Sequence, residues 1–181
     1  MNSRASVIMA ILIFAAAPSA VGQNIKSKVA PDFSLPNIDG DRITLSEMYG
    51  HGPIYISFWA TWCKPCREEL KIIQGLYEKY GEDGFTVLAV NTEGPRAISK
   101  IKSFAKSNGW TFDILIDDDG EVFRRKYKGF AQPYSVMTDP QGNIIFSAVG
   151  FKPGDEQHVE KLILEQIPPE KKDDAQSGSE E

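Results

Sequence analysis

Short apolar runs alternate with longer amphipathic segments through the middle of the chain. The runs over 54–58 and 85–90 are almost entirely apolar, which predicts two strands buried on both faces. Between them, apolar residues recur at helical spacing, which predicts a helix over 64–80 that ends at Gly81. The same criteria predict a helix over 95–107, a strand over 114–116, a hairpin of strands 134–138 and 143–149, and a closing helix over 155–167.

A further hairpin precedes these elements. Short segments with alternating apolar residues, at 32–35 and 42–45, flank 37–40, whose Asp-Gly pair is typical of a hairpin turn. The order is therefore a hairpin, then β-α-β-α-β, then β-β-α. This order predicts one α/β domain with a mixed central sheet, helices on both faces of that sheet, and an N-terminal hairpin extension.

The N-terminal residues depart from this pattern. Arg4 precedes an apolar run over 7–17, which is about half of the roughly 20 residues that a membrane-spanning helix needs. We therefore interpret 1–22 as a signal peptide cleaved after Gly22, with an uncleaved membrane anchor as the alternative. The protein is then expected to be exported to the periplasm or the cell envelope.

The C-terminal residues and the overall charge limit the classes of function. Residues 170–181 are mostly charged and include no large apolar residue, which predicts an acidic disordered tail after a domain at 23–169. The 20 basic and 25 acidic residues give a formal charge of −5, which argues against nucleic acid as a partner. Two Cys and two His are too few for a disulfide-rich scaffold or a Cys/His zinc module, so no metal site is expected.

The two cysteines stand at the junction of the first buried strand and the long helix, in the segment Trp62-Cys63-Lys64-Pro65-Cys66. A helix N-terminus carries unpaired N–H groups and a partial positive charge, which together lower the pKa of a thiol placed there. Pro65 fits the first turn because the N–H that it lacks would have no partner at that position. A spacing of three residues brings both sulfurs to one side of this turn.

This placement predicts thiol–disulfide exchange. Cys63 would attack a partner disulfide as the nucleophile, and Cys66 would resolve the mixed disulfide, so that the Cys63–Cys66 disulfide takes the place of a separate cofactor. Lys64 and Pro65 would help to set the reduction potential, and Trp62 would form an apolar wall. Two alternatives are a structural disulfide, which would constrain the unfolded chain little across so short a loop, and half of a metal site, which would need two more ligands.

These residues belong to a longer stretch, about 30–167, that resembles the thioredoxin superfamily and, more narrowly, its exported TlpA/ResA-like thiol–disulfide oxidoreductases. The resemblance is carried by the segments 30–35, 58–69, 90–92, 116–120 and 150–156. It implies a thioredoxin-like fold, protein or peptide thiols and disulfides as partners, and a membrane-bound electron donor. It also implies reduction of envelope-protein disulfides, with cytochrome c maturation as one role. We expect the protein to be a monomer.

The resemblance brings three more residues into the candidate site. Pro133 takes the place of the family's cis-proline, and Gln132 would offer its backbone to a bound peptide; a trans proline that starts an edge strand is the alternative. Glu69 matches the family's buried acid, whose raised pKa would let it exchange a proton with Cys66, and an exposed helix residue is the alternative. Ser57 stands where ordinary thioredoxin has a buried Asp, which favours the exported branch.

Two other functions share some of these features. A peroxiredoxin-like peroxidase shares the N-terminal hairpin, but Trp59 and Cys63 stand where the P-x-x-x-[ST]-x-x-C pattern needs Pro and Ser or Thr before Cys66. A copper carrier would use the same cysteine pair with a distant His. Neither His51 nor His158 has ligand spacing to that pair, so dithiol exchange remains the favoured interpretation.

Two charged stretches lie between the predicted strand at 114–116 and Pro133. The acidic run at 117–121 lacks the alternate spacing of a calcium-binding loop, and we interpret it as a strand-to-helix turn with acids at the helix start. The basic run at 124–128 is interpreted as an exposed helix face, with orientation of an acidic partner as the alternative.

Overall fold

The computed structural model describes residues 28–167, so the predicted signal peptide at 1–22 and the predicted tail at 170–181 lie outside the described residues. The centre of the fold is a five-stranded sheet in the order β5-β4-β3-β6-β7. Its strands are β3 (Ile54–Trp59), β4 (Thr86–Asn91), β5 (Asp113–Ile116), β6 (Tyr134–Thr138) and β7 (Ile144–Val149). β3, β4 and β5 run parallel, whereas β6 pairs antiparallel with both β3 and β7. The predicted mixed sheet is confirmed.

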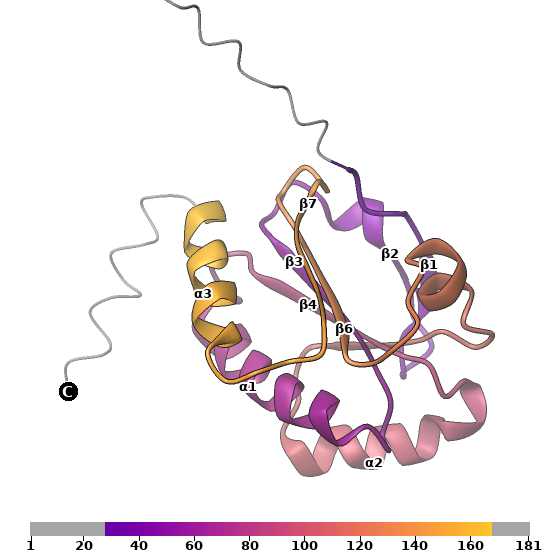
Figure 1. The fold of residues 1–181 in the computed structure, drawn as a ribbon. Helices are drawn as coiled ribbons and strands as arrows, with labels where there is room; N and C mark the ends of the chain where they lie inside the picture. Colours follow the sequence, from indigo (N-terminus) through magenta and orange to yellow (C-terminus); the bar gives the residue numbers. More distant parts are fainter. Residues whose placement is uncertain (1–27, 168–181) are drawn as a thin grey trace, which may run out of the picture.

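Three helices pack against one face of this sheet, where α1 and α3 lie side by side (Figure 1). They are α1 (Lys64–Tyr80), α2 (Ile98–Asn108) and α3 (Asp155–Gln166). Alternation along β3 divides the core in two, because Tyr55 and Trp59 lie among the helix residues and Phe58 lies on the opposite side. Within 28–167, no helix is both long enough and apolar enough to cross a membrane.

The opposite face is covered by shorter elements. They are the antiparallel hairpin of β1 (Ser34–Pro36) and β2 (Arg42–Thr44), the 3-10 turn η1 (Leu45–Met48), and the π-helical segment η3 (Glu121–Lys126). Figure 1 shows β1 and β2 on the side of the sheet away from α1 and α3. The predicted hairpin is confirmed. Helical segments flank both faces as predicted, with α1, α2 and α3 on one face and the shorter η1 and η3 on the other.

The predicted helix at 95–107 differs most from the structure. It begins as a separate 3-10 turn, η2 (Pro95–Ala97), and the regular α2 starts only at Ile98. Gly94 before this turn has a φ of 78°, a conformation that L side chains rarely adopt, and it redirects the chain after β4. The helix then continues one residue beyond the predicted end, to Asn108, and Gly109 closes it in the left-handed conformation.

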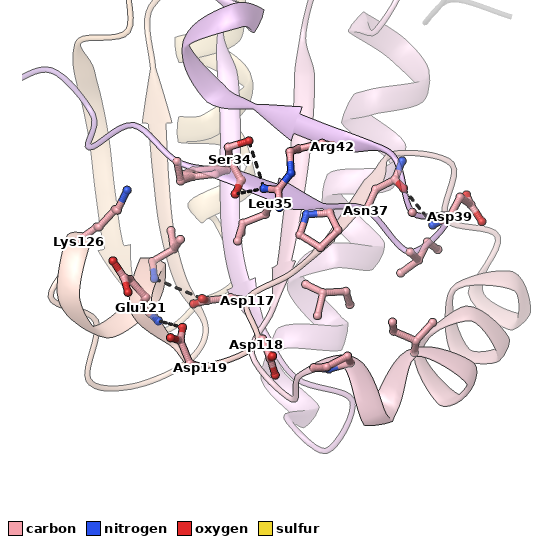
Figure 2. A pocket seen from close by; sticks show the side chains of 18 residues that line it. Ser34, Leu35, Asn37, Asp39, Arg42, Asp117, Asp118, Asp119, Glu121 and Lys126 are labelled. Carbon is pink, nitrogen blue, oxygen red and sulfur yellow. Dashed lines mark hydrogen bonds between the residues drawn. The ribbon is translucent and has the colours of Figure 1, made fainter.

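The acidic run after β5 caps the start of η3. The buried Asp117 carboxylate accepts the backbone N–H groups of Val122 and Phe123. The Asp119 carboxylate accepts that of Glu121 (Figure 2). The predicted strand-to-helix turn is therefore confirmed. A cavity of about 600 Å³ lies between this turn and the β1–β2 hairpin. Figure 2 shows the side chains that line it. No residue of the segment 62–66 lines this cavity, so it does not belong to the cysteine site.

Candidate active site

A disulfide joins Cys63 and Cys66 at the start of α1. Cys63 is the capping residue of the helix: its Sγ accepts the backbone N–H of Cys66 at 3.3 Å, and the two Cα atoms are 5.3 Å apart. Cys66 is fully buried, whereas 5% of Cys63 is exposed. The structure thus brings the two predicted redox residues together, and Cys63 is the one that a second molecule can reach.

The first turn of α1 favours a negative charge on Cys63. It contains no acidic residue, and its second position is Pro65, which has no N–H to leave unpaired. The N–H groups and the helix dipole at this end stabilise a thiolate. Lys64 is exposed and lies 3.8 Å from Glu68 on the outer face of the helix. Lys64 and Pro65 therefore lie between the cysteines and are exposed at the protein surface.

The loop between β3 and Cys63 is held by Glu93, which the sequence analysis missed. Thr61 donates both its backbone N–H and its hydroxyl to the Glu93 carboxylate, and Lys100 lies 3.3 Å from that carboxylate. Burial raises the pKa of Glu93, but hydrogen bonds from Thr61, Asn91 and Lys100 outweigh it, so the pKa lies below its ordinary value. A charged Glu93 thus anchors the segment that positions Cys63.

Glu69 lies one turn after Cys66 and has no exposed surface. Tyr55 Oη donates to its Oε1 at 2.8 Å, Ser57 Oγ donates to its Oε2 at 3.0 Å, and Ser135 Oγ also donates to Oε1. Burial raises the pKa of Glu69 above its ordinary value, and these hydrogen bonds offset the effect in part. The predicted burial of Glu69 is confirmed, and the alternative of an exposed helix residue is wrong.

Gln132 and Pro133 are joined by a cis peptide bond. β6 begins at the next residue, where Tyr134 pairs with Phe58 near the end of β3. Because Cys63 follows the end of β3, the cis bond lies at the same edge of the sheet as the disulfide. The predicted cis bond is confirmed. The alternative of an edge strand is wrong, since β6 lies between β3 and β7.

A surface hollow of about 280 Å³ brings Trp62 and Gln132 together. The Gln132 side-chain amide donates to Thr92 Oγ1 at 2.8 Å, which ties the segment before the cis bond to the end of β4. Trp62 does not pack over the cysteines as an enclosing wall, because 69% of it is exposed. It lines the hollow instead, together with the exposed ring of Phe130.

The sequence model of the AhpC/TSA family matches residues 27–147, which is more than half of the chain. The chain belongs to this family. Its thioredoxin-like fold, with the disulfide at the start of α1, is that of a thiol–disulfide oxidoreductase of the ResA and DsbE type.

Relatives with this activity in their names cover most of the chain. The thiol-disulfide oxidoreductase ResA of Geobacillus kaustophilus is 34% identical over 135 residues, which are 74% of this chain and 75% of the relative. ResA of Bacillus thuringiensis subsp. konkukian is 31% identical over 137 residues, 75% of this chain and 77% of the relative. Among solved structures, a Chlorobium tepidum protein described as thiol:disulfide interchange protein DsbE is 32% identical, with a TM-score of 0.70, and the match covers 78% of this chain and 97% of that one.

Other parts of the site come from residues distant in sequence. Tyr55 and Ser135 belong to strands and were not singled out, because a hydroxyl on a buried strand is a common feature. Glu93 carried a usable signal: the carboxyl ends of parallel strands meet at one edge, so an acid just after β4 lies beside the loop after β3.

Within 28–167, no group of three or more His, Cys, Asp or Glu residues is placed to hold a metal ion.

Proposed function

We propose that the protein reduces disulfides of exported proteins, with Cys63 as the nucleophile and Cys66 as the resolving thiol. The observation that carries this assignment is the difference in access between the two sulfurs, since Cys63 caps the helix and keeps 5% of its surface exposed, whereas Cys66 is fully buried. An attacking thiol must reach its partner, whereas a resolving thiol has only to reach its neighbour.

The reaction is a pair of exchanges. The Cys63 thiolate attacks one sulfur of the substrate disulfide, the substrate S–S bond breaks, and a mixed disulfide forms while the leaving thiolate takes a proton. Cys66 then loses its proton and attacks Cys63, which forms the Cys63–Cys66 disulfide and releases the second substrate thiol. Two electrons and two protons pass from the dithiol to the substrate. The disulfide found here is the oxidised product of this cycle.

Glu69 would accept and return the proton of Cys66. It is the acid one turn further along α1, it is buried, and its pKa is raised, which brings it closer to that of a thiol. A carboxyl group that stayed fully ionised at low pH would be a poorer proton donor. The hydroxyl groups of Tyr55, Ser57 and Ser135 hold this carboxyl in place during the exchange.

The substrate peptide would bind alongside Gln132. Among the described residues, no hydrogen bond engages the backbone N–H or C=O of Gln132, so both are available to an extended peptide. Trp62 would contact the same peptide from the side of the cysteines, and Lys64 and Pro65, between the cysteines, would tune the reduction potential.

The cellular setting is also part of the proposal. A signal peptide at 1–22 would export the protein to the periplasm or cell envelope, and the domain at 23–169 would act there as a monomer. A membrane-bound donor would return the disulfide to the dithiol, and apocytochrome c is one envelope substrate that fits this role. Support comes from the apolar run at 7–17 and from the similarity to ResA.

Trapping experiments test the assignment of the two thiols. Cys66→Ser should accumulate a mixed disulfide with a substrate protein, because the resolving thiol is gone, and Cys63→Ser should abolish both trapping and insulin reduction. The measurement is non-reducing electrophoresis with mass spectrometry, alongside an insulin turbidity assay. Trapping through Cys66 in the Cys63→Ser variant would overturn the assignment, and peroxide consumption faster than insulin reduction would favour the peroxidase alternative.

A further inference from the structure

The two most exposed large apolar side chains of the described residues lie at one place beside the cysteines. Phe130 is 84% exposed and Trp62 is 69% exposed, and both line the hollow of about 280 Å³. Its remaining walls are Thr92, Phe123, Arg124, Ala131 and Gln132. Single exposed apolar residues are ordinary, but two aromatic rings on one hollow indicate a surface that binds another molecule.

Arg124 adds a positive charge to this hollow. It is exposed and forms no ion pair within 28–167, whereas its neighbour Arg125 lies 3.7 Å from Glu121. The guanidinium of Arg124 lies over Gly120, where a Cβ atom would come within 2.8 Å of Arg124 Nε. The lack of a side chain at Gly120 thus leaves room for the guanidinium group. Of the two adjacent arginines, Arg124 is the one available to a partner.

The walls of the hollow are formed before anything binds. The ring of Phe123 is buried against Phe58, with 5.3 Å between the ring centroids, and Gly129 packs so closely on Phe123 that a Cβ would lie 2.0 Å from its ring. The hydrogen bond from the Gln132 side chain to Thr92 holds together two further residues that line the hollow. A surface held in this way loses little conformational entropy when it binds a ligand.

We propose that the hollow formed by Trp62, Phe130 and Arg124 selects the substrate segment. Its occupant is an extended segment of a disulfide-bearing polypeptide that carries an apolar side chain and an acidic residue next to its cysteine. The apolar side chain lies between the two aromatic rings, and the carboxylate pairs with Arg124. This inference rests on the proposed function, because the selected segment is the substrate of the Cys63–Cys66 pair.

The size and position of the hollow support this occupant. Small-molecule sites usually enclose about 300–1,000 Å³, and this hollow, at about 280 Å³, suits a side chain better than a free ligand. Trp62 immediately precedes Cys63, so a side chain beside Trp62 brings the adjoining disulfide to the reactive sulfur. The positive charge on Arg124, which forms no salt bridge within 28–167, selects a carboxylate even though the whole chain is acidic, with a formal charge of −5.

Four synthetic peptides test the proposal. All four have the same length and a single cysteine, which forms a mixed disulfide with 2-hydroxyethylthiol. They differ only in the two residues that flank this cysteine, which are Phe and Asp, Ala and Asp, Phe and Lys, or Ala and Lys. The second-order rate constant for reduction by the dithiol form of the full chain is measured for each peptide. We expect the Phe and Asp peptide to react fastest and the Ala and Lys peptide slowest, with the Asp preference shrinking as salt is added.

Variants assign the preference to its residues. Arg124→Ala should lower the ratio of the rate constant for the Asp-bearing peptides to that for the Lys-bearing peptides by about two- to fivefold, which is the loss expected for an exposed ion pair. Phe130→Ala should lower the ratio of Phe to Ala rate constants by about five- to tenfold, through lost apolar and aromatic contact. Arg125→Ala is the matched control and should leave both ratios unchanged, since Arg125 does not line the hollow.

The outcomes separate this inference from the proposed function. If the wild-type protein reduces all four peptides at equal rates, or if Arg125→Ala changes the ratios as much as Arg124→Ala, the hollow does not select the substrate. If the wild-type protein reduces neither the peptides nor bis(2-hydroxyethyl) disulfide, which is neutral and lacks flanking residues, the proposed reductase function fails together with this inference.

Discussion

Ser57 and Ser135 face each other in register across β3 and β6, and both hydroxyl groups donate to the carboxyl group of Glu69. With Tyr55 as the third donor, the buried acid is held by neutral groups, and no basic residue within 28–167 pairs with it. A carboxylate in this setting keeps its hydrogen bonds but loses much of its hydration, which is why its pKa rises.

Glu69→Gln should remove part of the pH dependence of stability. Because the pKa of Glu69 is higher in the folded protein than its ordinary value of 4.5, the folded state binds more protons between the two values. Stability therefore falls as the pH rises through this window, and Gln, which does not titrate, should abolish that fall. Thermal melts between pH 4 and pH 8 measure it, with the exposed Glu68→Gln as control. An unchanged slope in Glu69→Gln would contradict the prediction.

Ser135→Ala should raise the pKa of Glu69 further, because Ser135 donates a hydrogen bond that favours the charged carboxylate. In the pH–rate profile for the attack of Cys66 on the mixed disulfide, the limb that reports the titration of Glu69 should move to higher pH. The free energy of unfolding at neutral pH should fall by about 1–3 kcal/mol. Thr138→Val is the control, since the buried Thr138 hydroxyl, also on β6, has no hydrogen-bond partner among residues 28–167. A profile unchanged in Ser135→Ala would show that Glu69 does not govern this step.

Glu93→Gln should destabilise the protein by about 1–3 kcal/mol, because the charged acceptor of the two Thr61 hydrogen bonds is lost. The pKa of Glu93 is lowered in the folded state, so its contribution is present above the ordinary value of 4.5 and disappears as the pH falls through the folded value. The difference from wild type, measured by urea unfolding, should therefore shrink in acid. Lys100→Ala should cost less than about 1 kcal/mol, as an exposed pair does. An equal loss in both variants would refute the special role of Glu93.

Removal of 170–181 should leave the melting temperature unchanged. This segment is mostly charged and holds no large apolar residue, so it cannot bury the surface that would offset its ordering entropy. Differential scanning calorimetry of the full chain and of the truncated chain compares them directly. A melting temperature several degrees lower after truncation would mean that the segment packs against the domain.

Local patterns in the sequence predicted most of the fold. The helical spacing of apolar residues placed α1 at its observed bounds, and the Pro and Gly positions around 140 placed the β6–β7 hairpin within one residue. The Cys63–Cys66 pair was also predictable, since its spacing and its place before a helix both lie within a few residues. The cis bond before Pro133 and the burial of Glu69 came from the family resemblance and not from periodicity.

The sequence by itself therefore determined the helices and strands, the redox pair, and the position of that pair at the start of α1. Each of these depends on residues that are close together in the chain. Only the tertiary structure decided which hydroxyls surround Glu69, that Glu93 anchors Thr61, and that Trp62 shares a hollow with Phe130 and Arg124. Those contacts join residues from different strands and loops. The order and register of the strands bring these residues together, and both follow from the packing of the whole core.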